Sequence, residues 1–177
     1  MTHDEQYAQQ VCGEDAALDS VHIAPELEDD HADTIEMCEG VEKVLGCSIC
    51  KNLLLTNRQM TDVYLLLMPG DKPFKTKDLS KQIGSSRLSF ATPEQMLEYL
   101  DITPGSLSPL GLMNDKDTHV RLLIDSDLLA LEYVGVHPCI NSSTLRLRVS
   151  DLLSVVIPAM RHEITYVDLP RETETEG

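Results

Sequence analysis

Tryptophan is absent from the 177-residue sequence, and phenylalanine occurs only twice. Aromatic rings are the usual platforms on which unpaired bases stack, so their scarcity excludes a broad base-stacking surface for single-stranded nucleic acid. Hydrophobic residues still make up 42% of the chain, most of them aliphatic. A chain of this length can form one domain whose core needs no disulfide or metal.

The sequence also lacks a long hydrophobic run. The longest, Val63 to Met68, is far shorter than the roughly 20 residues of a membrane span. The start, MTHDEQYAQQ, is polar and no apolar signal segment follows it. The number of cysteines is odd, which disfavours a disulfide framework: Cys12, Cys38, Cys47, Cys50 and Cys139. We therefore expect a reduced, cytoplasmic protein with no membrane contact.

Positive charge is scarce. The 14 Lys and Arg residues face 30 Asp and Glu residues, which gives a formal net charge of −16. Nonspecific affinity for nucleic acid comes from cations that neutralise phosphates, so broad binding of that kind is excluded. One stretch is comparatively basic, with Lys51, Arg58, Lys72, Lys75, Lys77, Lys81 and Arg87. It is either a solvated face of mixed charge or a small phosphate-contacting patch.

Hydrophobic periodicity and turn residues predict an α+β fold. The expected helices span residues 3–17, 34–45, 75–83, 93–100 and 151–160, and the expected strands span 49–56, 63–68, 119–125, 130–136 and 143–149. The segment 102–115 is rich in Gly, Pro and Ser, which favours short strand pieces at a partner-exposed turn over a helix. Strands without strict alternation with helices predict a single domain with a mixed, mostly antiparallel sheet flanked by helices.

Motifs for metal or nucleophilic chemistry are weak. Cys47 and Cys50 have the C-x-x-C spacing of half a zinc site, but no second pair follows, and buried cysteines are the favoured interpretation. The histidines are scattered and no G-x-S-x-G is present. Lys51 opens an apolar run, so its side chain must reach the surface or face a polar pocket. His137, before Pro138, could equally be a strand-end residue that bonds backbone groups.

Several motifs between Cys50 and Leu153 occur together, in this order: CKNLLL at 50–55, RLSFA at 87–91, TPGSLSPLGLMND at 103–115, GVHP at 135–138 and NSSTL at 141–145. In this combination the chain resembles the YbaK/ProX aminoacyl-tRNA editing family. Within that family it is similar to the free-standing prolyl-tRNA deacylases, also called prolyl-tRNA synthetase-associated domains.

The resemblance implies an enzyme, an aminoacyl-tRNA hydrolase acting in trans on mischarged tRNA, with Ala-tRNA(Pro) as the leading substrate. It implies no cofactor and no metal. The implied catalytic residues are Lys51, Gly105 and His137, with Lys51 holding the phosphate or ribose of the acceptor end. The implied substrate-binding residues are Asn52, Arg87, Ser106, Pro109 and Asn114. The implied partners are the aminoacylated acceptor end of tRNA and, as an open alternative, prolyl-tRNA synthetase.

The resemblance also divides the chain. Residues 1–170 form one editing domain, with an acidic helical part at 1–45 and a core at 46–160, and residues 171–177 form a disordered acidic tail. Two other functions stay open at this point. One is a non-catalytic binding or regulatory module associated with a synthetase. The other is a deacylase for Cys-tRNA(Pro). The sequence does not indicate an oligomeric state.

Overall fold

The computed structural model describes residues 19–21, 40, 42, 43, 45–141 and 143–171. The predicted helix over 3–17, most of the one over 34–45 and nearly all of the predicted tail lie outside these residues. The end of the second helix is described: residues 42, 43 and 45 are helical, and Gly46 follows with a φ of 64°. In the part of the chain that the structure describes, no helix combines the length and apolar character needed to cross a membrane.

Eight strands form one mixed sheet in the order β1-β7-β6-β2-β3-β5-β8, with β4 also paired to β2. The strands are β1 (Asp19–Val21), β2 (Ser48–Asn57), β3 (Val63–Pro69), β4 (Leu88–Phe90), β5 (Val120–Asp125), β6 (Tyr133–Val136), β7 (Thr144–Arg148) and β8 (Ile164–Val167). Three pairs are parallel, β2 with β6, β3 with β5 and β5 with β8, and four are antiparallel. The predicted α+β fold with a mixed sheet is confirmed.

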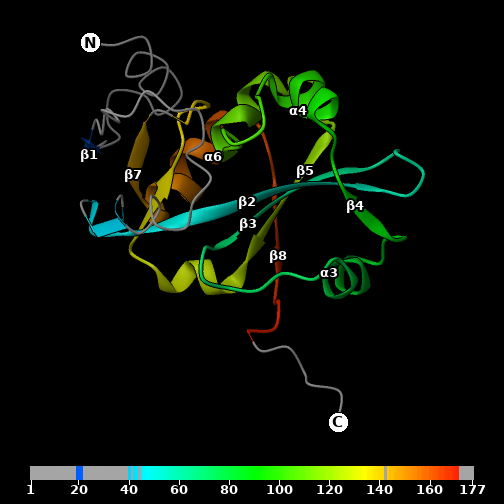
Figure 1. Cartoon of the computed structure of the whole chain (residues 1–177), viewed down its shortest axis with the longest axis horizontal. Coiled ribbons are helices and arrows are strands. Elements are labelled where there is room, and N and C mark those ends of the chain that lie inside the picture. The colour runs from blue at the N-terminus through cyan, green and yellow to red at the C-terminus, as the bar shows by residue number, and fades with distance from the viewer. Residues whose placement is uncertain (1–18, 22–39, 41, 44, 142, 172–177) are drawn as a thin grey trace.

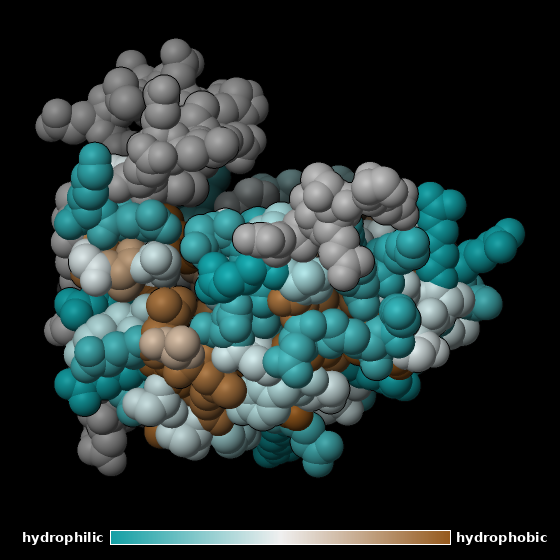
Figure 2. Space-filling view, turned by 90° about the horizontal axis from the view of Figure 1, so that it is seen from below, coloured by the Kyte–Doolittle hydropathy of each residue, from teal (hydrophilic) through white to brown (hydrophobic). Residues whose placement is uncertain are grey.

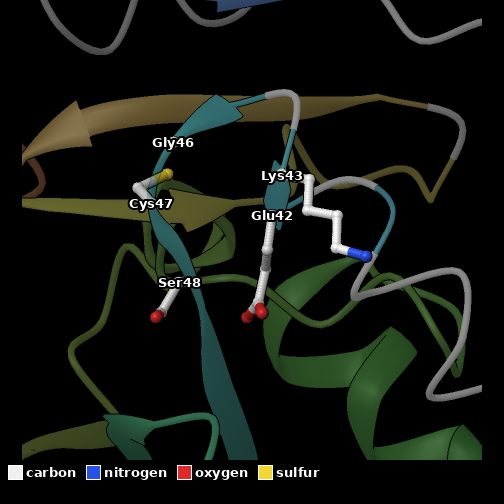
Figure 3. Close-up of a pocket in the computed structure, with 5 residues that line it drawn as sticks. All are labelled: Glu42, Lys43, Gly46, Cys47 and Ser48. Atoms are coloured by element: carbon white, nitrogen blue, oxygen red, sulfur yellow. The ribbon is translucent and has the colours of Figure 1, made fainter.

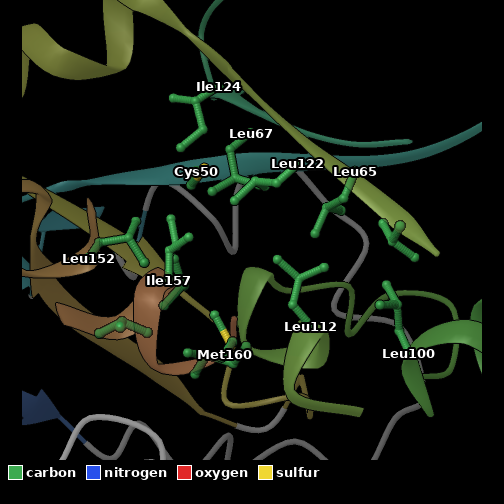
Figure 4. Close-up of a cluster of buried hydrophobic side chains, with 14 of the residues drawn as sticks. Cys50, Leu65, Leu67, Leu100, Leu112, Leu122, Ile124, Leu152, Ile157 and Met160 are labelled. Carbon is green, nitrogen blue, oxygen red and sulfur yellow. The ribbon is translucent and has the colours of Figure 1, made fainter. Parts of the chain in front are cut away.

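Helices cover both faces of the sheet (Figure 1). They are α3 (Thr76–Ile83), α4 (Pro93–Leu100), α5 (Val149–Asp151) and α6 (Ile157–Ala159), with η1 (Pro109–Asn114), η2 (Ser126–Ala130) and η3 (Leu152–Val156). Alternate residues of a strand point to opposite faces, so β2 and β3 contribute to two hydrophobic clusters. The first cluster includes Leu54, Leu65 and Leu67 and packs against η1 and the C-terminal helical segment (Figure 4). The second includes Leu55 and Leu66 and packs against α3.

Local signals predicted two helices well. Gly84 ends α3 in the left-handed region with a φ of 65°. Thr92 caps α4, with Pro93 in the first turn, and the side chain of Gln95 completes a capping box. The predicted hairpin of strands 49–56 and 63–68 is β2 and β3, paired from Cys50 opposite Pro69 to Thr56 opposite Val63.

Three predictions of local structure need correction. The segment 109–114 is a short 3₁₀ helix, not strand pieces, and Pro109 to Leu112 are buried rather than exposed. Ser108 caps it by accepting from the backbone N–H of Leu110, so polar turn residues here start a helix. The strand predicted over 130–136 begins at Tyr133, because η2 occupies 126–130. Strands β4 and β8 were not predicted; with three and four residues they are too short for a periodic signal.

The surface is predominantly polar, with scattered hydrophobic side chains. Figure 2 shows one face on which brown patches lie among hydrophilic residues. The large exposed hydrophobic side chains are Met60, Phe90, Leu97, Leu129, Val155 and Tyr166. They lie on six different segments of the chain, as expected for isolated surface residues.

Candidate functional site

Lys51 lies on β2, and His137 directly follows β6, the neighbouring parallel strand. The register of β2 with β6 sets Ser48 beside Val134 and Ile49 beside Gly135. Two residues further along each strand come Lys51 and His137, which therefore share the face of the sheet that carries Ile49 and Gly135. Gly135 lets the two strands pack closely here, since a Cβ there would lie 3.2 Å from Cγ2 of Thr144 and 3.3 Å from Cγ1 of Ile49. The topology thus brings two of the three predicted catalytic residues to one place.

The half-buried side chain of Lys51 ends on a backbone carbonyl. Its Nζ donates to the carbonyl oxygen of Lys72 over 2.7 Å, in the turn that follows β3. An ammonium group has three N–H donors, so two remain for a ligand. The sequence predicted that Lys51 either reaches the surface or faces a polar pocket. In the structure its half-buried ammonium group is bound to a backbone carbonyl.

His137 is held through one ring nitrogen. Its Nδ1 lies 3.0 Å from the carbonyl oxygen of Ser143. A carbonyl oxygen can only accept, so Nδ1 carries the hydrogen and Nε2 of the neutral ring keeps its lone pair. The backbone-bonding interpretation of His137 is therefore correct for Nδ1, and Nε2 is left available to accept a hydrogen bond.

Asn52 points to the other face of β2, together with Cys50 and Leu54. Its Nδ2 donates to the carbonyl oxygen of Cys50 over 3.2 Å. Its Oδ1 is buried and has no hydrogen-bond partner among the described residues. A buried carbonyl oxygen without a donor is costly, so Asn52 offers a vacant acceptor on the face opposite Lys51.

The loop with the predicted pocket residues lies on the Asn52 side of the sheet, because Leu107 and Leu110 pack in the first hydrophobic cluster. Gly105 is exposed with a φ of 87°, a conformation that favours glycine. Ser106 and Pro109 are buried. The residues just before this loop lie near the segment that follows His137. Burial raises the pKa of the Cys139 thiol to about 12, and the nearby charge of the Asp101 carboxylate adds to this effect.

Asn114 has a structural contact. Its Nδ2 donates to the carbonyl oxygen of Leu100 over 2.8 Å and so ties the end of η1 to the end of α4. That bond satisfies one of the last carbonyls of a helix. The side chain thereby holds the loop 103–109 between two anchored helices.

Arg87 lies at the other end of β2 from Lys51. Together with Arg58 and Ser89 it lines a pocket of about 340 Å³. Asn57 pairs with Leu88, and at about 3.3 Å per residue Lys51 and Arg58 are ~23 Å apart along the strand. Within the described part of the chain, neither arginine has a carboxylate partner at ion-pair distance.

A second pocket, of about 370 Å³, lies at the start of β2 and is lined by Glu42, Lys43, Gly46, Cys47 and Ser48 (Figure 3). Oε1 of Glu42 accepts from the backbone N–H of Ile49 over 2.9 Å, which joins the preceding helix to the strand. Burial raises the pKa of the Cys47 thiol above its ordinary value. The pocket therefore holds a protonated thiol beside a carboxylate that is already engaged.

In the C-x-x-C pair Cys50 is buried and Cys47 is half-buried. Cys50 is buried in the first cluster, and its Sγ lies 3.6 Å from the carbonyl oxygen of Met68. Burial raises its pKa to about 12. Among the residues that the structure describes, no group of three or more His, Cys, Asp and Glu side chains could hold a metal ion.

Two buried ionic groups were not found by sequence reasoning. Lys72 is almost fully buried and pairs with Asp125 and Asp127. His162 is buried and pairs with Asp115 over 3.0 Å. Lys72 and Asp125 are 53 residues apart in the chain, and Asp115 and His162 are 47 residues apart. No local sequence pattern can identify pairs at such separations. The only signal was Lys72 itself, a charged residue within the turn Gly70-Asp71-Lys72-Pro73.

Comparisons with known proteins agree on one family. The profile described as "Aminoacyl-tRNA editing domain" matches residues 29–155. The prolyl-tRNA editing protein ProX of Acetoanaerobium sticklandii is 36% identical over 142 residues, 80% of this chain and 87% of the relative. The prolyl-tRNA synthetase associated domain-containing protein 1 of Mus musculus is 33% identical over 132 residues, 72% of this chain and 76% of the relative.

Solved structures support the fold. A candidate trans-editing enzyme for prolyl tRNA synthetase superposes with a TM-score of 0.67 at 16% identity, covering 96% of this chain and 99% of the other. A hypothetical protein, APE2540, superposes with a TM-score of 0.63 at 17% identity, covering 92% and 97%. At these identities the likeness concerns the arrangement of helices and strands.

Proposed function

The chain belongs to the aminoacyl-tRNA editing domain family, also known as YbaK/ProX, and from this membership we propose that it is a trans-editing deacylase for Ala-tRNA(Pro). The relatives at 36% and 33% identity carry prolyl-tRNA editing or prolyl-tRNA synthetase association in their names. The observation that supports the proposal is the register of β2 with β6, in which Ile49 pairs with Gly135, so that Lys51 and His137 each follow this pair by two residues.

In the proposed reaction a water molecule attacks the ester carbonyl between the amino acid and the terminal ribose. The carbonyl oxygen becomes an oxyanion, and its collapse breaks the ester bond to release alanine and the ribose hydroxyl. An aminoacyl ester is activated enough that positioning and charge stabilisation can carry this step without a covalent nucleophile. The protein then has to hold the acceptor end, stabilise the oxyanion and accept a hydrogen bond from the water.

Each predicted residue has a proposed task in that scheme. Lys51 directs its two remaining N–H groups at the phosphate or ribose of the acceptor end. Nε2 of His137 accepts from the water or from the substrate, because Nδ1 is engaged by Ser143. The exposed backbone at Gly105, without a side chain, allows close approach of the amino acid.

Asn52 and the loop from Ser106 to Pro109 form the proposed pocket for the amino acid. The unpaired Oδ1 of Asn52 is available for a donor, such as the substrate α-ammonium group. In this proposal Ser106 and Pro109, which are both buried, border the pocket and limit its size. A pocket that fits a methyl group can exclude the larger proline ring by steric conflict, as in a second-sieve editing site.

The pocket of Arg58, Arg87 and Ser89 is the proposed contact for the tRNA backbone. Its ~23 Å separation from Lys51 along β2 places it several nucleotides away from the reacting ester. Guanidinium groups without carboxylate partners suit phosphate oxygens. This local site would allow an acidic protein with a net charge of −16 to bind tRNA.

The experiment is deacylation of alanyl-tRNA(Pro) by the purified protein, with prolyl-tRNA(Pro) and cysteinyl-tRNA(Pro) alongside. Lys51→Ala is the test variant, and Lys77→Ala, at an exposed lysine on α3, is the matched control. Loss of alanine with the wild type and the control, but not with Lys51→Ala, supports the proposal. Preferential loss of cysteine would reassign the substrate, and no turnover of any ester would leave a binding module.

A further inference from the structure

Lys72 is a buried cation at the edge of the sheet. The residue is 2% exposed, and its Nζ lies 2.6 Å from Oδ2 of Asp125 and 3.1 Å from Oδ2 of Asp127. Asp125 is itself fully buried at the end of β5. The buried ammonium group therefore lies between one buried carboxylate, Asp125, and one partly exposed carboxylate, Asp127.

Arg171 closes this group from outside. Its Nε lies 2.7 Å from Oδ2 of Asp127, and its Nη1 lies 3.4 Å from Oδ2 of Asp71. We call Lys72, Asp125, Asp127 and Arg171 the Lys72 cluster. Its members follow or end the parallel strands β3, β5 and β8, so the carboxyl ends of three neighbouring strands are joined by charge.

A gain in folding stability does not by itself explain why these charged residues are buried together. Removing a lysine and a carboxylate from water is expensive, and hydrophobic residues of similar size in their place are often equally stabilising. The contacts instead restrict where the ammonium group can lie: it donates to Oδ2 of Asp127 over 3.1 Å and lies 2.6 Å from the charged Oδ2 of Asp125. A fixed Lys72 also fixes any group that is bound to its backbone.

That group is Lys51. The carbonyl oxygen of Lys72 accepts from Nζ of Lys51 over 2.7 Å. The backbone N–H of Lys72 donates to the carbonyl oxygen of Pro69 over 3.2 Å, and Pro73 restricts Lys72 to extended conformations. The backbone of Lys72 is thereby restricted on its N-terminal side by the hydrogen bond and on its C-terminal side by Pro73. The buried side chain of Lys72 adds a third restraint.

We propose that the Lys72 cluster positions Lys51: the pair with Asp125 and Asp127 anchors Lys72, whose carbonyl oxygen holds the Lys51 ammonium group in place. Lys72 is a positioning residue, since it acts through Lys51. Gly70 belongs to the same device, because a Cβ there would lie 2.5 Å from the carbonyl oxygen of Ile49. The turn is thus pressed against β2 two residues before Lys51.

The inference deepens the proposed function and rests on it for its catalytic meaning, while the contact between Lys72 and Lys51 can be tested without activity. The test protein is the full chain with ¹⁵N-labelled lysine, in which the ammonium signal of Lys51 is assigned by its loss in Lys51→Arg. The variant is Lys72→Met/Asp125→Asn, which removes both charges and leaves no buried ion unpaired. The control, Asp115→Asn/His162→Gln, removes the other buried pair.

We expect the Lys51 ammonium signal to shift and to exchange faster with water in the Lys72→Met/Asp125→Asn variant, and to stay in place in the control. With alanyl-tRNA(Pro), kcat should fall about 10- to 100-fold in the test variant while KM stays within about twofold. Asp127→Asn, which keeps the pair of Lys72 with Asp125, should give a smaller change of the same kind and serves if the double variant does not fold.

Two results would overturn the inference: an unchanged Lys51 signal in both test variants, or equal loss of kcat in test and control variants. A changed Lys51 signal in a protein whose wild type hydrolyses no ester would instead contradict the proposed function. In that case the positioning of Lys51 by the Lys72 cluster would stand.

Discussion

Nδ1 of His137 lies 3.0 Å from the carbonyl oxygen of Ser143, which accepts its hydrogen. This single contact fixes both the tautomer and the orientation of the ring, because the other nitrogen must then carry the lone pair. Nε2 has no partner among the described residues. The proposed role of His137 as an acceptor follows from this geometry.

His137→Ala should therefore lower kcat for alanyl-tRNA(Pro) by about 100-fold or more, the range in which a positioned acid–base group acts. The fold should remain, since the half-buried ring carries one backbone contact. Single-turnover deacylation measures the effect, and His119→Ala, at an exposed histidine, is the control. Wild-type kcat in His137→Ala would remove the imidazole from the mechanism.

Gly70→Ala should destabilise the protein and slow deacylation together. The added Cβ would lie 2.5 Å from the carbonyl oxygen of Ile49, so the turn or β2 must shift, at a cost of about 1–3 kcal/mol in the free energy of unfolding. Gly40→Ala is the control, because no atom of the described residues lies within 4 Å of a Cβ there. Urea denaturation distinguishes them: equal stability of the two variants would contradict the packing of the turn against β2.

The fold could be predicted where the chain gives a local physical signal. The hairpin of β2 and β3 follows from two apolar runs around a polar turn, and α4 follows from Thr92, Pro93 and Gln95 at its start. The short helix at 109–114 was mistaken because Pro, Gly and Ser, which usually break helices, here sit at its cap and first turn. The short strand β8 is stabilised by pairing with β5, a contact that no local pattern encodes.

The site was predictable in part. The motifs of the family predicted Lys51 and His137 as site residues, and the register of β2 with β6 puts them at neighbouring positions. The separation of Asn52 from Lys51 is a consequence of strand alternation and could have been derived from the strand prediction alone. The Lys72 cluster could not, since its ion pairs join the ends of β3 and β5, more than 50 residues apart. Charge pairing at that range depends on the topology of the sheet.

His162→Ala should lower the free energy of unfolding by about 3 kcal/mol, the size expected when one member of a buried ion pair is removed. Nε2 of His162 lies 3.0 Å from Oδ2 of Asp115, and Nδ1 lies 2.7 Å from the carbonyl oxygen of Met160. Both acceptors lose their donor in the variant. Urea denaturation beside Lys77→Ala, at an exposed residue of α3, provides the measurement, and a difference below about 1 kcal/mol would rule out a structural pair.

Asp127 should make stability depend on pH in the acid range. The hydrogen bond from Lys72, followed by the charges of Lys72 and Arg171, lowers the pKa of Asp127 below its ordinary value of 3.8. A lowered pKa in the folded state contributes stability that is present above pH 3.8 and is lost as the pH falls through the lowered value. Asp127→Asn should therefore be less stable than the wild type at pH 6, and the difference should shrink below pH 3.8. Thermal unfolding followed from pH 6 to well below pH 3.8 tests it, and a difference that stays constant over this whole range would refute the assignment.

The pocket of Arg58, Arg87 and Ser89 should govern tRNA binding without affecting the chemical step. It lies ~23 Å along β2 from Lys51, so Arg58→Ala/Arg87→Ala should raise KM about tenfold and leave kcat within about twofold. Loss of two phosphate contacts should also flatten the dependence of log KM on log salt, lowering its slope by about 2.

Lys75→Ala/Lys81→Ala, which changes two exposed lysines outside the pocket, is the charge-matched control. If both double variants shift KM and its salt dependence equally, the effect comes from net charge, and the pocket is no specific phosphate site. If kcat falls instead, the arginines act on the reacting ester, and the proposal that they contact the tRNA backbone away from the ester is wrong.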